Sequence, residues 1–387
     1  MSREFSDSGL TDSAVDADEL RREGKVVDRE YDHEIAPPEM CRVLAFPALG
    51  RRVSELSWRV EVEGFVYQPG EVRLRKKILL RLLRRYMKVD PAEFTSPMFQ
   101  ERIEPFISGT EKGHCPTFNI GHGEKQSVRR TYRNGRFTGS VEVPDKDMGD
   151  THSKSAGVAL KLQVELGDQG QRTAEAPAFL IPEVGVSLVS DIDDTIKVTN
   201  VRQRREMLVN TFLKPFTAVE GMAPVYRRLA DAEIAFHYVS SSPWQLYDSL
   251  SEMLEEADFP PGSVHLRNFR LRDHMLRRMF LLHRRGKGGV IRHLLEMYPK
   301  RKFLLVGDSG ERDPKIYARL ARQFPDQVLG ILIRLLEGSD EGPLRERFEE
   351  HTNVWSKFRL FSTATELESH CTQSVSYTHL TLPTSSQ

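Results

Sequence analysis

Four short apolar runs, separated by segments with helical spacing, place the strongest constraint on the fold of this chain. They span residues 186–190, 235–239, 303–306 and 328–333. Runs of this kind are typical of strands that are buried on both faces of a sheet. Between them, apolar residues recur with the helical period in residues 222–229 and 290–298. Because strands that alternate with helices form right-handed βαβ units, we predict a doubly wound α/β domain with a parallel sheet over residues 183–370.

The preceding part of the chain has apolar residues at every second position. Trp58, Val60 and Val62 alternate with charged residues, and the same period continues in residues 158–166. This alternation is typical of strands with one buried face. Leucines with helical spacing interrupt the strands near residue 80. We therefore predict an antiparallel β-sandwich with one basic helical insertion over residues 39–182.

The two ends of the chain lack the pattern of a folded core. Residues 1–38 carry eleven acidic and five basic residues and few aromatic ones. We expect a disordered acidic arm there, because too little apolar surface is available to offset the entropy of ordering. The stretch from residue 374 to 387 shows neither the helical nor the strand period, so we expect a disordered tail over residues 371–387.

The cysteines and the apolar segments bear on localisation. Cys41, Cys115 and Cys371 are widely spaced and give neither a disulfide framework nor a zinc pattern, so a reducing compartment is expected. The N-terminal residues lack the apolar segment of a secretory signal, and no run of about 18 apolar residues occurs. We expect a cytoplasmic protein without a membrane span, peripheral at membranes at most.

Acidic residues follow two of the predicted strands. Asp191, Asp193 and Asp194 come directly after the first apolar run, and Asp308 follows the third run after one glycine. In open α/β sheets, ligands bind at the carboxyl ends of the strands. If the two strands are neighbours, carboxylates converge, and such hard oxygen ligands suit Mg²⁺. Asp194 is expected to be structural, because its side chain alternates away from its neighbours. Asp313 lies five residues after Asp308, where a helix N-cap is an equally good interpretation.

Two further polar residues complete the candidate site. Ser240 ends the second apolar run, and Ser242 and Pro243 are typical of the start of the next helix. The backbone N–H groups and the hydroxyl there could bind an anion. Lys287 lies in a basic stretch before the helix at 290–298, where a cation beside carboxylates would stabilise developing phosphoryl charge. A solvent-exposed basic face is the alternative for Lys287.

The order of these motifs resembles that of the haloacid dehalogenase superfamily: DxDxT, a strand-terminal Ser, a downstream Lys and GDxxxxD. More narrowly, four stretches resemble the catalytic domain of the actin-patch phosphatidate phosphatase family. They read SDIDDTIK, YVSSSPWQLY, HLRNFRL and VGDSGERDPKIY. The likeness runs from about residue 186 to 334, and the β-rich region before it is similar to that family's N-terminal domain. The site is similar, more distantly, to that of the lipin phosphatidate phosphatases.

The resemblance implies a role for each matching residue. Asp191 would attack phosphorus and form an aspartyl-phosphate, while Asp193 would act first as general acid and then as general base. Thr195 would help to hold the first motif, Ser240 would bind a phosphoryl oxygen, and Lys287 would balance charge. The implied Mg²⁺ ligands are Asp191, Asp193, Asp308 and, as a weaker or outer ligand, Asp313.

One position departs from the family pattern. Many relatives carry a His before the motif-three Lys, whereas Gly286 stands there in this chain. Arg284, Arg285 or Arg292 could share that role, and the first two are assigned to substrate binding. Ser241, beside Ser240, is also assigned to substrate binding, with a helix-capping role as the alternative.

Two basic stretches bear on partners, although the chain as a whole is neutral, with 56 basic and 56 acidic residues. Residues 73–88 carry eight cations and no acid, with an apolar stripe on one side. Such a helix can lie on an anionic membrane surface, or it can pack on the sandwich with its basic face in water. Residues 264–292 hold nine cations and one acid, which could attract an anionic headgroup. No nucleic-acid recognition motif is apparent, and no protein partner can be read from the sequence.

The expected function is therefore that of a Mg²⁺-dependent phosphatidate phosphatase, which forms diacylglycerol and phosphate. The activity is implied by the resemblance. Two alternatives stay open: a catalytically silent phospholipid-sensing module, and a haloacid-dehalogenase-type phosphatase that acts on a soluble phosphomonoester.

Overall fold

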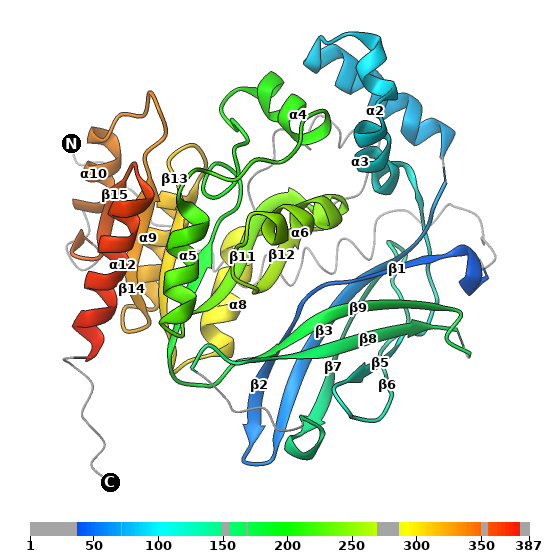
Figure 1. The fold of residues 1–387 in the computed structure, drawn as a ribbon, viewed down its shortest axis with the longest axis horizontal. Coiled ribbons are helices and arrows are strands. Elements are labelled where there is room, and N and C mark those ends of the chain that lie inside the picture. The colour runs from blue at the N-terminus through cyan, green and yellow to red at the C-terminus, as the bar shows by residue number, and fades with distance from the viewer. Residues whose placement is uncertain are drawn as a thin grey trace, which may run out of the picture. The chain divides into compact units, whose positions relative to one another are not determined.

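Figure 1 shows the computed structural model of the chain, which describes residues 37–70, 72–148, 155–167, 169–268, 286–349 and 355–379. The predicted acidic arm lies outside the described residues except for Pro37 and Pro38. Pro38 opens the short 3-10 turn η1 (Pro38–Met40). The described strands form two sheets, one before residue 182 and one after it.

The second sheet is parallel throughout, as predicted. Its six strands lie in the order β12-β11-β10-β13-β14-β15, and each neighbouring pair is parallel. The four predicted apolar runs form the four central strands, and the two edge strands are additions to the prediction. The strands are β10 (Val186–Ser190), β11 (Ala235–Pro243), β12 (Ser263–Arg267), β13 (Lys302–Asp308), β14 (Val328–Arg334) and β15 (Phe358–Phe361).

Helices pack on both faces of this sheet (Figure 1). Successive residues of a strand point to opposite faces. Leu188 and Leu304 belong to one hydrophobic cluster with α5, α6 and α12. Val189 and Leu305 belong to another with α8 and α9. The helices are α5 (Met222–Asp231), α6 (Tyr247–Glu256), α8 (Lys287–Met297), α9 (Asp313–Gln323) and α12 (Ala364–His379).

The prediction of a disordered tail is wrong for residues 371–379, which continue helix α12. Cys371 is fully buried, and Leu367, one turn earlier, lies in the same hydrophobic cluster. Arg228 of α5 forms an ion pair with Glu368 of this helix. Packing on α5 and the sheet therefore holds a segment whose own sequence lacks a clear helical period. Residues 380–387 lie outside the described residues.

The first sheet differs from the predicted antiparallel sandwich. Nine strands form one sheet rather than two, with β1-β3-β2-β9-β8-β5-β6 as its main order, and β2 pairs with β9 in parallel. Strand β3 joins the sheet together, because it pairs with β1 and β2 along one edge and with β4 and β7 along the other. The strands are β1 (Arg42–Ala45), β2 (Ala48–Ser54), β3 (Ser57–Gln68), β4 (Gly109–Thr110), β5 (Thr117–Ile120), β6 (Gln126–Ser127), β7 (Arg136–Pro144), β8 (Val158–Leu166) and β9 (Arg172–Leu180).

This mixed sheet has its own hydrophobic core. Trp58, Phe118, Phe137 and Leu162 come from four different strands and are buried in one cluster. The rings of Phe118 and Phe137 lie 5.5 Å apart, although β5 and β7 are not neighbours in the strand order. The sheet therefore curls so that its two ends share one core.

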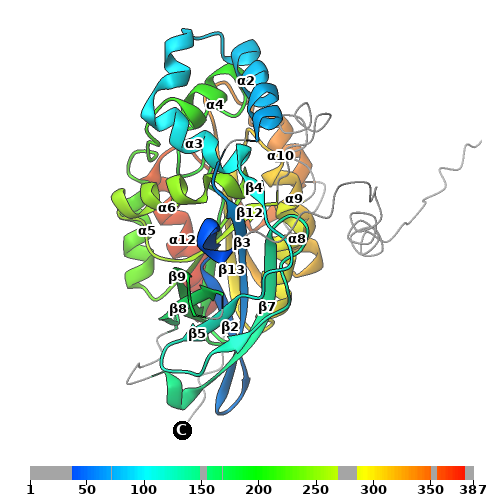
Figure 2. The same cartoon turned by 90° about the vertical axis from the view of Figure 1, so that its right-hand side faces the viewer.

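The basic helix predicted near residue 80 is α2 (Arg73–Met87), and a second helix, α3 (Pro97–Ile107), follows it. Helix α2 lies beside α3 and α4 (Arg204–Phe212) (Figure 2). Its residues Leu79, Leu83 and Met87 are fully buried in a hydrophobic cluster with residues of these two helices. The apolar stripe of α2 thus packs on helices rather than on the β-sheet. No helix in the described part of the chain has both the length and the apolar composition that crossing a bilayer requires.

Aromatic contacts link the first sheet to the parallel sheet's helices. Trp244 stacks on Phe65 of β3, with ring centroids 4.1 Å apart, and Tyr247 of α6 lies 4.9 Å from Phe46. The predicted boundary between residues 182 and 183 therefore crosses a continuous hydrophobic cluster. The remaining helical segments are η2 (Pro91–Thr95), η3 (Asp145–Asp147), η4 (Trp244–Leu246) and α10 (Gly342–Glu349).

Candidate active site

A tight loop follows β10 and fixes the first acidic residues. The N–H of Asp191 donates to a backbone carbonyl of β13 (2.9 Å), so the loop starts beside the neighbouring strand. Asp194 has a φ of 55°, in the left-handed region that Asp adopts more readily than most residues. Its carboxylate accepts the N–H groups of Thr199, Asn200 and Val201 at 2.6 to 2.7 Å. Asp194 therefore shapes the loop, as the sequence predicts.

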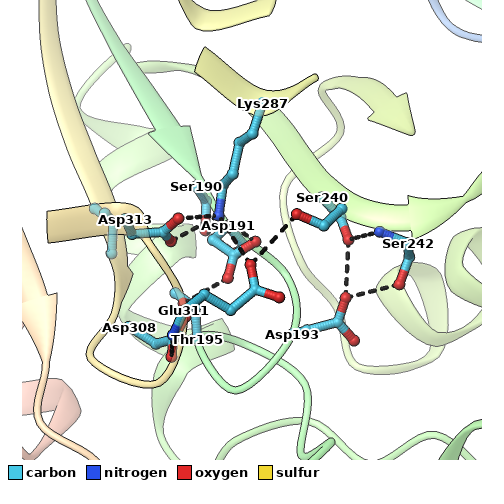
Figure 3. Close-up of polar contacts among 12 residues, drawn as sticks. Ser190, Asp191, Asp193, Thr195, Ser240, Ser242, Lys287, Asp308, Glu311 and Asp313 are labelled. Carbon is cyan, nitrogen blue, oxygen red and sulfur yellow. Dashed lines mark hydrogen bonds and ion pairs between the residues drawn. The ribbon is translucent and has the colours of Figure 1, made fainter. Parts of the chain in front are cut away.

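Lys287 links two buried carboxylates (Figure 3). Its Nζ lies 2.7 Å from Asp191 Oδ1 and 2.6 Å from both carboxylate oxygens of Asp313. Lys287 is the first residue of α8 and Asp313 the first residue of α9, so two helix starts deliver these groups to the end of β10. Gly307 leaves room for Asp313, because a Cβ at this position would lie 2.2 Å from Asp313 Oδ2.

Burial and charge compete in this group. Burial raises the pKa of the Asp191 carboxyl to about 7, although the charge of Lys287 opposes the rise. Burial lowers the pKa of Lys287, but the carboxylates of Asp191 and Asp313 outweigh it and hold that pKa well above the usual value. Lys287 is therefore cationic at neutral pH. The alternative of a solvent-exposed Lys287 is wrong, because its side chain is 3% exposed.

Asp308 ends β13 and belongs to a second acidic group. One carboxylate oxygen each of Asp191, Asp308 and Glu311 lies within 4.8 Å of the others. Asp308 Oδ1 accepts the N–H groups of Gly310 and Glu311, whereas its Oδ2 is buried without a hydrogen-bond partner among the described residues. Burial, together with the neighbouring acids, raises the pKa of both Asp308 and Glu311 well above the usual range.

This carboxylate cluster, Asp191, Asp308 and Glu311, fits a divalent cation. Burying three carboxylates together is costly unless a positive charge accompanies them. Hard oxygen ligands at one strand-end edge are those that Mg²⁺ takes. Two of the four predicted ligands, Asp193 and Asp313, lie outside this cluster. Glu311 belongs to it but is absent from the predicted set, and its place in the acid-rich motif between Asp308 and Asp313 is the signal that could have identified it.

Asp193 lies apart from the carboxylate cluster (Figure 3). Its Oδ1 is 2.9 Å from Lys197 Nζ and accepts the Thr199 hydroxyl at 2.8 Å. Its Oδ2 accepts the hydroxyls of Ser240 and Ser242, each at 2.8 Å. Burial alone would raise the pKa of Asp193, but the charge of Lys197 and these hydrogen bonds lower it below the usual range. Asp193 is therefore ionised at neutral pH in this arrangement.

Two other predicted residues, Thr195 and Ser241, contact the carboxylate cluster. The Thr195 hydroxyl donates to Asp191 Oδ2 at 3.2 Å, and the Ser241 hydroxyl donates to Glu311 Oε2 at 3.4 Å. Most of the basic stretch 264–292 lies outside the described residues, including both Arg284 and Arg285.

Lys197 and Ser242 contact Asp193 but are absent from the predicted site. The Lys197 side chain is 2% exposed. Its position four residues after Asp193 is the sequence signal that could have indicated this ion pair. Ser242 is not the N-cap of a helix as expected, because β11 continues through Pro243, which is itself the N-cap of the 3-10 helix η4 (Trp244–Leu246), and α6 begins at Tyr247.

Comparison with known families finds a match for the part of the chain that carries this site. Residues 186–335 match the family described as "Phosphatidate phosphatase APP1, catalytic domain". Phosphatidate phosphatase APP1 of Saccharomyces cerevisiae is 38% identical over 167 residues, which cover 42% of this chain and 28% of the yeast protein. An uncharacterized protein of Schizosaccharomyces pombe is 35% identical over 187 residues, 47% of this chain and 30% of that protein. The matched part thus spans less than a third of either relative.

Among solved structures, a crystal structure of a proposed β-galactosidase from Bacteroides fragilis overlaps 78% of this chain and 40% of that one, with 10% identity and a TM-score of 0.24. A likeness at this level carries no argument about fold or activity.

Proposed function

Because residues 186–335 match the catalytic-domain family of phosphatidate phosphatase APP1, we propose that this chain is a Mg²⁺-dependent phosphatidate phosphatase. One observation carries the proposal. The ends of two neighbouring parallel strands bring a buried carboxylate, Asp191, into contact with a buried lysine, Lys287, and beside the further acids Asp308 and Glu311. This is the combination that phosphoryl transfer needs: a nucleophile, positive charge and ligands for a metal ion.

Asp191 is proposed as the nucleophile. One of its carboxylate oxygens bonds to phosphorus while the bond from phosphorus to the glycerol oxygen breaks. The glycerol oxygen takes a proton from Asp193, so that diacylglycerol leaves. Water then attacks phosphorus and gives a proton to Asp193 while the bond between phosphorus and the Asp191 oxygen breaks, so that phosphate is released and the Asp191 carboxylate is restored. Lys287 and Thr195 hold the Asp191 carboxylate in place for both steps.

Asp193 must be protonated before the first step, although the unliganded arrangement favours its ionised form. Ser240 is proposed to bind a phosphoryl oxygen, and it also donates a hydrogen bond to Asp193. When Ser240 turns to the substrate, Asp193 loses one of the hydrogen bonds that stabilise its charge. Substrate binding would thus favour the protonated form that the first step requires.

Asp191, Asp308 and Glu311 would hold the Mg²⁺. A bound Mg²⁺ supplies positive charge to the phosphoryl oxygens and aligns them with the nucleophile. The ligands are delivered by rigid backbone, since Asp308 ends a central strand and its Oδ1 is fixed by the N–H of Glu311 at 3.1 Å.

The proposal is tested by phosphate release from phosphatidate in mixed detergent micelles, with Mg²⁺ or with EDTA. We expect activity with Mg²⁺ alone, and losses of at least about a hundredfold in Asp191→Asn and Asp193→Asn. Asp326→Asn is the matched control, because Asp326 is an exposed aspartate between α9 and β14. Full activity in either active-site variant would reject the role assigned to that residue.

Membrane recruitment through the basic side of α2 is a separate proposal. Arg81, Arg84 and Arg85 are exposed, while the apolar stripe is buried, so the attraction would be electrostatic rather than insertion. The triple change to Glu should weaken sedimentation with anionic vesicles. Charge reversal of three exposed cations of α9, Lys315, Arg319 and Arg322, is the control. Equal binding by both triple variants and the wild type would contradict this proposal.

The same assays separate the two alternatives. A phospholipid-sensing module would bind phosphatidate vesicles without releasing phosphate. A phosphatase for soluble phosphomonoesters would prefer a sugar phosphate, and that sugar phosphate would compete with phosphatidate.

A further inference from the structure

A cavity of about 70 Å³ lies beside Asp193, between helices α3 and α4. A single water needs roughly 10–15 Å³ on this measure, so there is room for several carbon atoms. Half of its lining is apolar, and there the rings of Phe106 and Phe212 lie 5.6 Å apart. The apolar lining residues are Phe106, Val201, Met207, Leu208, Phe212, Pro243 and Leu246. The polar lining residues are Asp193, Thr199, Thr211, Ser241, Ser242, Arg267 and Glu311.

Hydrogen bonds fix this cavity to Asp193. Asn210 of α4 donates to the backbone carbonyl of Thr199 at 3.1 Å, and the Thr199 hydroxyl donates to Asp193 Oδ1 at 2.8 Å. On the opposite wall, Arg102 of α3 donates to the backbone carbonyl of Thr211 at 2.9 Å. The two helices and Asp193 are therefore held in one arrangement.

We propose that this cavity receives the first carbon atoms of the leaving alcohol and selects phosphomonoesters whose alcohol is apolar near the phosphate. The inference rests on the proposed function, because it takes Asp193 as the group that protonates the leaving oxygen. That oxygen must come within hydrogen-bond reach of Asp193 during the reaction. The carbon bonded to it then points away from Asp191, where the phosphorus lies.

The cavity occupies this position. Its lining contains Asp193 and Glu311, which belongs to the carboxylate cluster, together with apolar residues such as Leu208 and Phe212. Methylene groups gain free energy by leaving water for the apolar part of this lining, whereas a hydroxyl placed against that part would lose its hydrogen bonds to water. The geometry therefore favours an alkyl or acyl-bearing alcohol over a sugar.

The test uses soluble n-alkyl phosphates from methyl to hexyl, which separate this cavity from any membrane surface. We expect kcat/KM of the wild-type chain to rise roughly fourfold with each added methylene. The rise should stop after a few carbons, when the volume of about 70 Å³ is filled. Phosphatidate in mixed micelles is assayed in parallel.

Two variants on the cavity wall test the assignment, Thr211→Phe and Met207→Phe. Each fills part of the volume, so the rise of kcat/KM with chain length should fall below about twofold for each methylene. Val209→Phe on the same helix is the matched control, because Val209 packs into the hydrophobic cluster and is not part of the cavity lining. Circular dichroism and thermal unfolding show which variants are folded. If one of the two wall variants does not fold, the other one tests the assignment.

The outcomes distinguish the two levels of inference. If the wild type hydrolyses the series with a kcat/KM that does not depend on chain length, the cavity assignment is overturned while the phosphatase proposal stands. Loss of the chain-length dependence in Val209→Phe to the same degree as in the wall variants also overturns it. Failure of the wild type to release phosphate from phosphatidate and from every alkyl phosphate refutes the proposed function itself.

Discussion

The contact of Lys287 with two buried carboxylates makes a quantitative prediction. Replacing Lys287 by Met keeps most of the side-chain volume but leaves Asp191 and Asp313, both fully buried, without their shared cation. Removing one partner of a buried ion pair costs about 3–5 kcal/mol. We therefore expect the free energy of unfolding at pH 7.5, measured by urea denaturation in EDTA, to fall by about 3–5 kcal/mol.

A double-mutant cycle can measure how much of the effect of Lys287→Met comes from its ion pair with Asp313. Asp313→Asn removes one of the two carboxylates, so Lys287→Met should cost less in that background, with a coupling energy of at least about 1 kcal/mol. Lys300→Met, which removes a largely exposed ion pair with Glu183, is the control and should change stability by less than about 1 kcal/mol. If the effects of Lys287→Met and Asp313→Asn add within about 0.5 kcal/mol, the reasoning about a buried pair is refuted.

Three other perturbations probe the site and its support. Mg²⁺ at 100 times its Kd should stabilise the wild type by about 2.7 kcal/mol and so raise its unfolding temperature, but it should not stabilise Asp308→Asn. Scanning fluorimetry measures both unfolding temperatures, and an equal rise in the variant would contradict the cation site. The buried histidines His237 and His265 should contribute stability that is lost as pH is lowered from about 6.5 to 4, because burial lowers the pKa of His265 to about 4 and that of His237 well below 6.5, so the unfolded chain binds more protons at these two positions. The raised pKa values of Asp191, Asp308 and Glu311 act in the opposite direction, so the test compares the wild type with His265→Gln, which should lose less stability over this range. Urea denaturation of both proteins at pH 7.5, 6 and 5 measures this, and an equal pH dependence of the two would contradict it. Gly307→Ala should cost about 1–3 kcal/mol in thermal unfolding, because its Cβ would meet the Asp313 carboxylate, and wild-type stability would show that Asp313 can move aside.

The parallel sheet was predictable because its central strands are buried on both faces and so are apolar along their whole length. Edge strands β12 and β15 lack this signature: Arg267 of β12 is partly exposed and Arg359 of β15 is exposed. Helix α12 was missed for a related reason, since contacts with α5 and the sheet, rather than its own periodicity, hold it.

The mixed first sheet was less accessible to sequence reasoning. Alternation of apolar residues shows that a strand has one buried face, but it does not say which strands are neighbours. The parallel pairing of Leu49 in β2 with Phe179 in β9 joins residues 130 positions apart. The prediction of two sheets was therefore an assumption about topology. The long strand β3 pairs on both of its edges and so joins the strands into one sheet.

Within the site, the positions of the acids were predictable and their partners were not. Strand ends bring Asp191 and Asp308 together, as their sequence positions imply. Which lysine meets which acid depends on helix starts and a loop turn: Lys197 takes Asp193, and Lys287 is shared by Asp191 and Asp313. Asp308 forms no ion pair within the described part of the chain, and burial raises its pKa. If a cation binds as proposed, the cluster of Asp191, Asp308 and Glu311 would hold it, whereas Asp193 already pairs with Lys197 and Asp313 with Lys287.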